Sequence, residues 1–307
     1  MIRYAFAAVG LVLAMVGAAS GETLKAGPGQ QYKMPSQAIA HAHDGDTVQI
    51  EPGTYFDCAI VRQNNLTIEG IGANVVMTDK PCRGKALLIT NGNNITIRNL
   101  TLQRVRVPDH NGAGIRAQGG NLTVENTRFL DNEDGILIAH NPTATVRIID
   151  SEFVGNGKCE GNCAHGIYAT QIALLDVEHS RFFNTQIGHS IKSRAAKTIV
   201  RNCDIEDGPT GTSSYQIDIP NGGTVLIEGN KLEKGPHAQN HGTAIAIGEG
   251  GVKHPTESLT IKNNTLINNT GFTTTFVRNI TATGAQLSGN SFQGGKVIPL
   301  AGDGSVH

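Results

Sequence analysis

Short segments with the pattern apolar, variable, apolar recur along the chain at nearly regular intervals. From one segment to the next, the last apolar residue moves 23 to 34 residues along the sequence. Such alternation predicts β-strands, because neighbouring side chains of a strand point to opposite faces. The segments lie at residues 66–68, 95–97, 122–124, 146–148, 175–177, 225–227 and 259–261, and residues 198–200 and 285–287 fit the pattern more loosely.

Each repeat contains two further strand-like segments. A polar corner and a large apolar residue follow the first segment, as at Ser151 and Phe153. A segment with the pattern small, apolar, variable, apolar precedes it, at residues 86–89, 114–117, 135–138, 166–169, 190–193, 216–219 and 244–247. Three short strands per repeat predict an all-β parallel solenoid of about nine or ten turns. Residues 33–42 predict one short helix that caps its N-terminal end.

The first twenty residues differ from the rest of the chain. Arg3 precedes an apolar run at residues 4–16, and small residues follow at 17–20. This pattern predicts a secretory signal peptide at residues 1–20, whose apolar run is too short to span a bilayer. Residues 21–307 are then a single secreted or periplasmic domain, with no membrane span.

An oxidising compartment allows the five cysteines to pair. Cys58 and Cys82 lie about one repeat apart, and Cys159 and Cys163 bracket a tight loop, so we expect these two disulfides. Cys203 is left over, and its neighbours indicate a buried position in the solenoid wall.

With this repeat the chain resembles the right-handed parallel β-helix proteins of the pectin-lyase-like class. The resemblance extends over the mature chain and includes its opening, an Ala-rich helix followed by residues 44–55, Asp-Gly-Asp-Thr-Val-Gln-Ile-Glu-Pro-Gly-Thr-Tyr. It implies a right-handed β-helix. Members of this class are mostly secreted enzymes that act on acidic polysaccharides as lyases, C5-epimerases, hydrolases or esterases, and others are non-catalytic surface or assembly proteins.

Composition narrows the choice of partner. The chain has 38 glycines, no tryptophan, 17% charged residues and a net charge of −1. Nothing in this balance attracts a nucleic acid or a membrane surface. Composition therefore disfavours these two partners, whereas the resemblance implies a polysaccharide; we also expect a monomer.

Polar residues concentrate on one face of the third strand. Alternation predicts an outward column with neighbours about 4.8 Å apart, made of Leu88, Arg116, Leu137, Tyr168, Lys192, Asp218 and Ala246. Asp134, His165, His189, Tyr215 and Thr243 stand where the strands begin, although strict alternation would turn these side chains inward. The small residues Gly114, Gly135 and Gly166 are expected to leave a shallow floor for a polymer.

These residues suit proton abstraction next to a carboxylate. In β-elimination or C5-epimerisation of a uronate, a base removes the α proton while cations stabilise the charge that develops. We assign Lys192 or Arg194 as the neutralising cation and His189 or Tyr215 as the base, and we expect substrate contacts from six further residues: Arg116, Asp134, His165, Tyr168, Asp218 and Glu249. Arginine beside a histidine at a strand end also resembles the alginate epimerases and related lyases.

Two further interpretations remain open. A glycoside hydrolase needs two carboxyl groups about 5 to 9.5 Å apart, whereas Asp134 and Asp218 are separated by about 14 Å over three turns. The acidic residues at 204, 206 and 207 keep hydrolysis open. A non-catalytic glycan-binding or assembly solenoid is also compatible with the sequence, and in it Lys192 and Asp218 form an ordinary ion pair.

No cofactor or metal is predicted, although two sets of residues raise the question. Asp131, Glu133 and Asp134 carry the oxygen ligands that Ca²⁺ prefers, in a sequence that is also typical of a solvated turn. His237 and His241 have a spacing that suits zinc only on a helix, and their Gly and Pro neighbours disfavour one.

Overall fold

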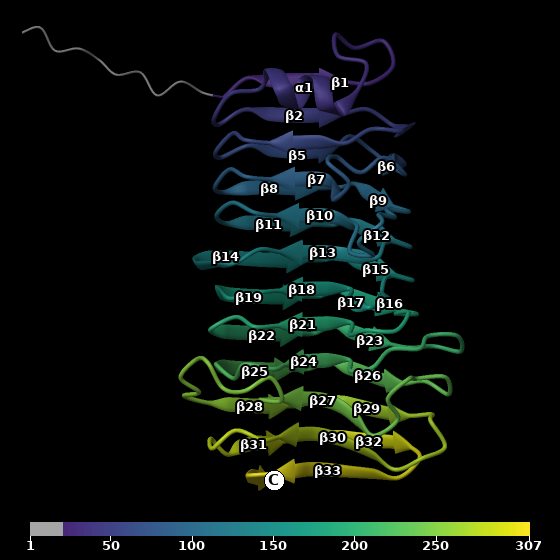
Figure 1. The fold of residues 1–307 in the computed structure, drawn as a ribbon, viewed down its shortest axis with the longest axis vertical. Coiled ribbons are helices and arrows are strands. Elements are labelled where there is room, and N and C mark those ends of the chain that lie inside the picture. Colours follow the sequence, from purple (N-terminus) through teal and green to yellow (C-terminus); the bar gives the residue numbers. More distant parts are fainter. Residues whose placement is uncertain (1–20) are drawn as a thin grey trace, which may run out of the picture.

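The structure, a computed structural model, describes residues 21–307 as one stack of β-coils (Figure 1). Parallel strands form three sheets, and each complete coil contributes one strand to each sheet. Two sheets have ten strands, as the repeat predicted, and the third has twelve. The predicted all-β parallel solenoid is confirmed. The predicted signal peptide, residues 1–20, lies outside the described residues.

The three sheets are named A, B and C in the order in which each coil passes through them. Sheet A contains β1 (Thr23–Ala26), β2 (Thr47–Ile50), β5 (Thr67–Gly70), β8 (Ile95–Arg98), β11 (Leu122–Glu125), β14 (Asn141–Ile149), β19 (Ile172–Glu178), β22 (Lys197–Arg201), β25 (Thr224–Glu228), β28 (Leu259–Lys262), β31 (Ala285–Ser288) and β34 (Gly304–Val306). Sheet B contains β3 (Gly53–Tyr55), β6 (Val75–Thr78), β9 (Thr101–Gln103), β12 (Arg128–Leu130), β15 (Glu152–Val154), β20 (Arg181–Phe183), β23 (Asp204–Glu206), β26 (Lys231–Lys234), β29 (Thr265–Asn268) and β32 (Ser291–Gly294). Sheet C contains β4 (Ala59–Val61), β7 (Ala86–Thr90), β10 (Ala113–Ala117), β13 (Asp134–Ile138), β18 (Ile167–Ala169), β21 (Ile191–Ser193), β24 (Ile217–Ile219), β27 (Thr243–Ile247), β30 (Thr274–Asn279) and β33 (Val297–Gly302).

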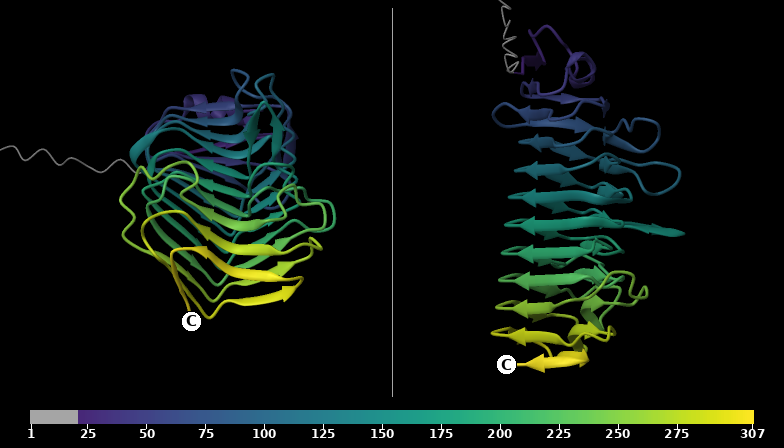
Figure 2. Two further views of the ribbon diagram at one scale, coloured as in Figure 1. Left: turned by 60° about the horizontal axis from the view of Figure 1, so that its bottom comes forward. Right: turned by 90° about the vertical axis from the view of Figure 1, so that its left-hand side faces the viewer.

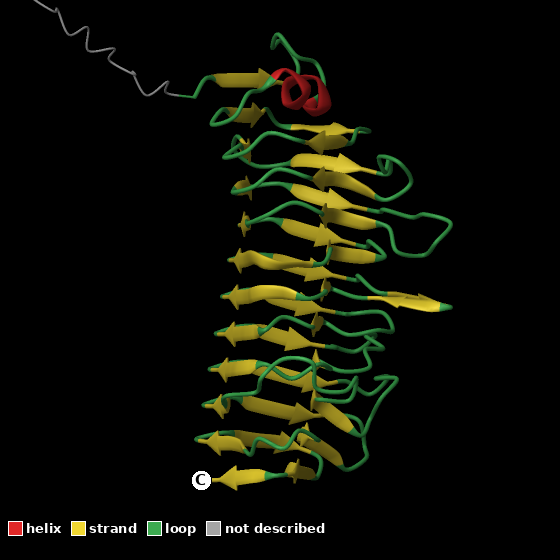
Figure 3. Cartoon of the chain, turned by 60° about the vertical axis from the view of Figure 1, so that its left-hand side comes forward, coloured by secondary structure: helices red, strands yellow, loops and turns green. Residues whose placement is uncertain are grey.

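Two elements stand apart from the sheets. Helix α1 (Pro35–His41) begins with proline, buries Ala38 and Ile39, and covers the N-terminal end of the stack (Figure 3). A two-stranded antiparallel hairpin, β16 (Lys158–Glu160) and β17 (Asn162–Ala164), projects sideways from the stack (Figures 2 and 3). The hairpin leaves the coil between sheets B and C, on the side where the strands of sheet C begin. Over residues 21–307, no helix is long and apolar enough to cross a membrane.

The core consists of identical positions stacked from coil to coil. Phe129, Phe153 and Phe182 are fully buried and stack face to face, with ring centroids 4.6 Å apart at both steps. At the corner before sheet B, buried Asn230 and Asn264 accept backbone N–H groups of the preceding coils. The corner column is therefore structural, because its side chains satisfy backbone groups that the strands leave unpaired.

The cysteines pair as the sequence predicted. Disulfides join Cys58 to Cys82 and Cys159 to Cys163, and the second closes the hairpin. Cys203 is buried in the wall, and burial raises the pKa of its thiol to about 12. An unreactive wall thiol is consistent with this pKa, since the thiolate is the reactive form.

Sheet C departs from strict alternation where its strands begin. A Cβ added to Gly135 would lie 2.7 Å from a ring carbon of Phe153, and one added to Gly114 would lie equally close to Phe129. These glycines therefore face the phenylalanine stack inside the coil, and the expectation that they form the floor of an outer groove is wrong. With two successive positions turned inward, the residue before them emerges on the outer face.

Replacing Gly135 tests this arrangement. We expect Gly135→Ala to lower the free energy of unfolding by about 1–3 kcal/mol, because the methyl group would also meet the carbonyl oxygen of Gly166 at 2.4 Å. Gly242→Ala is the matched control, since the nearest atom to its added Cβ is 3.4 Å away. Equal stability of the two variants in chemical denaturation would contradict the inward placement.

Candidate active site

The outward column of sheet C has the predicted register over most of its length. Arg116, Leu137, Tyr168, Lys192, Asp218 and Ala246 are successive strand partners. The assignment of Leu88 to this column is wrong, because Ile89 pairs with Arg116 while Leu88 pairs with the inward Ile115. Three successive apolar residues, Leu87, Leu88 and Ile89, fit the strand pattern in either of two registers, and the pairing with β10 decides between them.

A second column runs beside the first and consists of stacked rings. The His165 and His189 rings are 4.7 Å apart at an interplanar angle of 10°, and the His189 and Tyr215 rings are 5.0 Å apart at 20°. The His165 ring also meets the outward Tyr168 edge-on at 5.2 Å. The expectation from strict alternation that these histidines point into the core is therefore wrong, for the backbone reason described above.

Backbone N–H groups select the tautomer of both histidines. The amide of His189 donates to Nδ1 of His165 at 3.0 Å, and the amide of Tyr215 donates to Nδ1 of His189 at 3.2 Å. An accepting Nδ1 leaves the proton of a neutral imidazole on Nε2. Burial lowers the pKa of His165 well below its usual value and, with the charge of Lys192, lowers that of His189 to about 3.

Asp218 of the outward column contacts the ring column through His189. Nε2 of His189 lies 3.4 Å from Oδ2 of Asp218, and Nζ of Lys192 lies 3.8 Å from the same oxygen. Burial raises the pKa of Asp218 to about 6, although Lys192 opposes the shift. At neutral pH the carboxylate thus lies beside a neutral histidine and faces the ammonium group of Lys192.

Arg194 lies at the far end of β21 and is held by two contacts. Its Nε donates to the hydroxyl of Tyr168 at 3.2 Å, and its Nη1 donates to Oδ1 of Asn221 at 2.6 Å. Neither partner carries a negative charge, so the guanidinium retains its capacity to bind a carboxylate.

Tyr215 and Glu249 approach each other from adjacent coils. The Tyr215 hydroxyl donates to Oε2 of Glu249 at 2.7 Å, and Oε1 of Glu249 lies 3.2 Å from Arg278. Burial and the Glu249 carboxylate raise the pKa of Tyr215, so the phenol is protonated at neutral pH. The pair offers a proton donor beside an acceptor.

A cavity of about 430 Å³ opens where the ring stack begins. Asp134 lies in its wall, is 1% exposed, and accepts the backbone N–H of His165 at 2.7 Å. Burial raises the pKa of this carboxyl to about 8, against the smaller opposing effects of that hydrogen bond and of Arg116. The cavity is lined by Asn111, Asp134, Leu137, Gly161, Cys163, His165, Tyr168 and Lys192.

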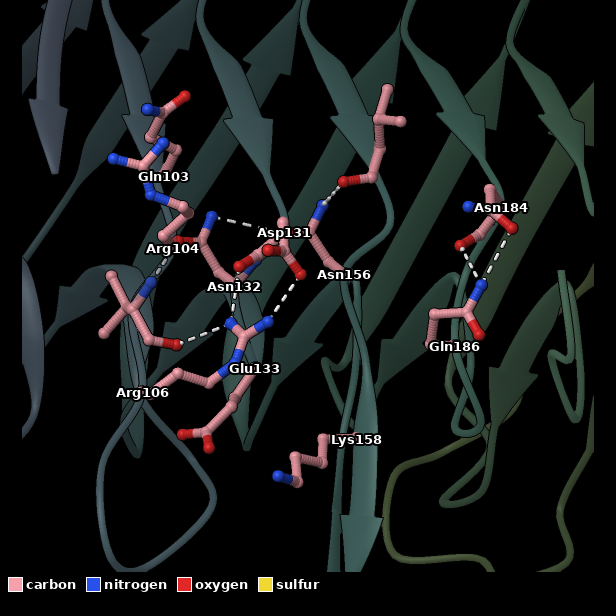
Figure 4. Close-up of polar contacts among 12 residues, drawn as sticks. Gln103, Arg104, Arg106, Asp131, Asn132, Glu133, Asn156, Lys158, Asn184 and Gln186 are labelled. Carbon is pink, nitrogen blue, oxygen red and sulfur yellow. Dashed lines mark hydrogen bonds and ion pairs between the residues drawn. The ribbon is translucent and has the colours of Figure 1, made fainter. Parts of the chain in front are cut away.

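The residues considered as metal ligands have other partners. Asp131 pairs with Arg106 (Figure 4). Glu133 accepts the N–H groups of Val107 and Gly112, and Asp134 accepts the N–H group of His165. His241 stacks on Phe272 at 4.7 Å. Within residues 21–307, no group of three His, Cys, Asp or Glu side chains is arranged to hold a metal ion.

Sequence reasoning selected most of this site but missed two amides. Asn221 positions Arg194, and Asn111 lines the cavity. Neither is distinguishable in sequence from the many asparagines that the chain places in turns. Only their position on loops beside sheet C sets them apart.

Comparisons with known proteins agree with this fold. The family model described as "Right handed beta helix region" matches residues 37–161 and 158–302. The crystal structure of an alginate lyase from Paenibacillus sp. str. FPU-7 is similar, with 16% identity, a TM-score of 0.57, and coverage of 90% of this chain and 99% of that chain. Pectate lyase Pel9A is similar at 13% identity and a TM-score of 0.53, with coverage of 93% of this chain and 80% of that chain. No curated protein matches the chain in sequence.

The buried carboxyl of Asp134 predicts a pH-dependent stability. Its pKa is 3.8 in an ordinary setting and about 8 here, so the folded protein holds a proton that the unfolded chain has lost. Stability should therefore fall as the pH rises between these two values. We expect Asp134→Asn to be more stable than the wild type at about pH 9 by roughly 2 kcal/mol or more, with a smaller difference at about pH 5.

Denaturant unfolding of both proteins across this pH range provides the measurement. Asp204→Asn is the control, because Asp204 is exposed on sheet B. If the difference between Asp134→Asn and the wild type does not change with pH, Asp134 does not hold the extra proton.

Proposed function

The chain belongs to the right-handed β-helix family, and from this premise we propose that it is a secreted enzyme that cleaves a uronate-containing polysaccharide by β-elimination. The observation that carries the proposal is the convergence, on one face of sheet C, of two cations and a hydrogen-bonded acid–base pair. Lys192 and Arg194 are the cations, and Tyr215 with Glu249 is the pair. A solenoid wall requires no such group of side chains for its stability.

Lys192 and Arg194 are suited to the substrate carboxylate. They lie two residues apart on β21 and its exit, so both project from the same coil. A carboxylate held between them becomes more electron-withdrawing, and the charge that forms when the α proton leaves is stabilised in a partly dehydrated setting. Asp218, which also contacts His189, lies 3.8 Å from the Lys192 ammonium group.

Tyr215 and Glu249 are suited to the proton transfers. As the phenol passes its proton to the Glu249 carboxylate, the phenolate oxygen takes the proton from C5 of the uronate. The C4–O bond then breaks, a C4=C5 double bond forms, the proton on Tyr215 passes to the departing oxygen, and Glu249 returns its proton to Tyr215. His189 is less suited as the base because its Nδ1 accepts an amide and its Nε2 carries the proton.

The arrangement favours elimination over epimerisation. His165, His189 and Tyr215 all stand in one column, so their ionisable groups approach a substrate from one side. Elimination can use a single acid–base group on that side, whereas inversion at C5 requires a proton to arrive from the opposite face. C5-epimerisation shares the first step, and product analysis separates the two.

Glycoside hydrolysis and non-catalytic binding receive less support than elimination. Asp134 and Asp218 belong to β13 and β24, which are three strands apart in sheet C, so they are too distant for a glycosidase pair. The similar structures are an alginate lyase and a pectate lyase, at 16% and 13% identity, and this similarity concerns the fold. A non-catalytic glycan-binding protein would bind the same polymers without changing them.

The direct test is incubation with alginate, polygalacturonate and other uronate polymers. Absorbance of the unsaturated product reports elimination, and proton NMR reports inversion at C5. We expect an increase in absorbance with at least one polymer. If no polymer yields double bonds, inverted centres or shorter chains, the enzyme proposal is wrong.

The two cations should be essential for turnover. We expect Lys192→Ala and Arg194→Ala each to lower kcat by about 10²–10³-fold, with thermal unfolding close to that of the wild type. Lys197→Ala and Arg181→Ala are matched controls, because both side chains are exposed on other sheets. Retention of most of the activity in both site variants would exclude their assigned part in charge stabilisation.

Tyr215→Phe isolates the proton transfer. Loss of a general acid–base group lowers the rate by about 10²–10⁴-fold, and we expect this effect on kcat with little change in KM. Tyr32→Phe, at the N-terminal cap, is the control. An active Tyr215→Phe enzyme would move the base to another residue while leaving the cation assignment intact.

A further inference from the structure

The ring column of sheet C continues toward the N-terminal end as buried alanines. Ala86 and Ala113 pair in register with Asp134, and both are fully buried. In the neighbouring outward column Ile89 is only 3% exposed. Both columns are therefore covered at β7, and the ring column stays covered through β10 as far as Asp134, which lines the cavity.

Two loops provide this cover and are fixed in place. In loop 79–85, Cys82 is tied by its disulfide to Cys58 and packs on the cluster that contains Ala86 and Ile89. Loop 104–112 is held by Glu133, which accepts the backbone N–H groups of Val107 and Gly112 in this loop. Lys85 and Asp109 join the loops at 2.6 Å. The cover is thus cross-linked covalently and electrostatically.

The hairpin β16–β17 extends the cover along one side of the cavity. His110 of loop 104–112 lies 3.1 Å from Glu160 of the hairpin, and Gly161 and Cys163 line the cavity. At the opposite end of the outward column, Arg278 has half of its side chain exposed. The polar face is thus closed at Asp134 and open at Arg278.

Polar atoms at the closed end lack partners. Oδ1 of Asn111, in the cavity wall, and Nη1 of Arg116 are buried without a hydrogen-bond partner among residues 21–307. Arg116 is also the strand partner of Leu137, which lines the cavity. An unmade hydrogen bond at a buried group is costly, so such atoms mark a place where a ligand supplies the missing partner.

We propose that the cavity is a subsite for the terminal sugar of an acidic polysaccharide, so that the enzyme acts from a chain end. This inference rests on the proposed function. A terminal uronate brings hydroxyl groups for Asn111 and a carboxylate for Arg116. The covering loops lie over sheet C on the N-terminal side of Asp134, so the rest of the polymer leaves over Lys192 and Asp218 toward Arg278.

The cavity lies a short, defined distance from the reacting groups. Asp134 and Lys192 belong to strands separated by two spacings, or about 10 Å. A chain end seated in the cavity therefore places one particular glycosidic bond over Lys192 and Tyr215. The product should be a short oligosaccharide of one size.

Binding of end-labelled oligomers tests the subsite without turnover. Oligomers of mannuronate, guluronate and galacturonate, long enough to reach Arg278, carry the same bulky fluorophore at the reducing or the non-reducing end. With Tyr215→Phe protein, we expect one label position to weaken binding at least tenfold relative to the other. Equal affinity for the two label positions overturns the closed-end subsite, and so does a lack of binding by every oligomer.

Two substitutions in the proposed subsite test its contribution to oligomer binding. Arg116→Ala and Asn111→Ala should raise the Kd for the better-binding oligomer by about tenfold or more without lowering the unfolding temperature, because the atoms removed have no protein partner. Arg128→Ala, exposed on sheet B, is the control. Unchanged Kd values in both variants would count against the subsite.

In wild-type digests we expect one short product from the start and a slow fall in viscosity. A broad mixture of products with an immediate loss of viscosity overturns chain-end action and leaves the lyase proposal intact. Turnover failure on all polymers, combined with end-selective binding, removes the lyase proposal and leaves the subsite standing.

Discussion

Parallel hydrogen bonding between successive coils is the constraint on which this molecule depends. Every strand of a sheet pairs with the strand one coil earlier, so equivalent side chains repeat at about 4.8 Å. Inside the coil this spacing produces the phenylalanine stack and the asparagine corners. On the outer face of sheet C, the same spacing brings the rings of His165, His189 and Tyr215 into contact. Core stability and the candidate site therefore have a common geometric origin.

A local irregularity converts this regular wall into a site. The small residues that begin the strands of sheet C turn inward against the phenylalanines, and the preceding side chains then emerge outside. Their rings become buried against one another and against the outward column. Burial in turn keeps His189 neutral and Asp134 protonated at neutral pH. The lowered and raised pKa values are thus consequences of packing.

Loops of unequal length determine how a polymer can reach this face. The coils before β13 carry long connections that fold over sheet C and are held by a disulfide, an ion pair and a buried glutamate. The coils from β18 to β24 leave the face accessible. A uniform solenoid would offer an open track in both directions, whereas these loops close one end.

The sequence by itself determined the repeat, the three strands per coil, both disulfides and the outward column from Arg116 to Ala246. These features follow from alternation and spacing, which are local properties of the chain. It also selected His189, Lys192, Arg194 and Tyr215, because ionisable side chains are conspicuous in an otherwise plain wall. Alternation failed at Leu88, at the glycines and at the direction of the histidines. At the glycines and histidines the backbone responds to side chains of the neighbouring coil, and at Leu88 the register is set by pairing with β10; only the tertiary structure contains these contacts. The tautomers, the buried carboxyl of Asp134 and the closed end of the groove were likewise decided by groups brought together from different coils.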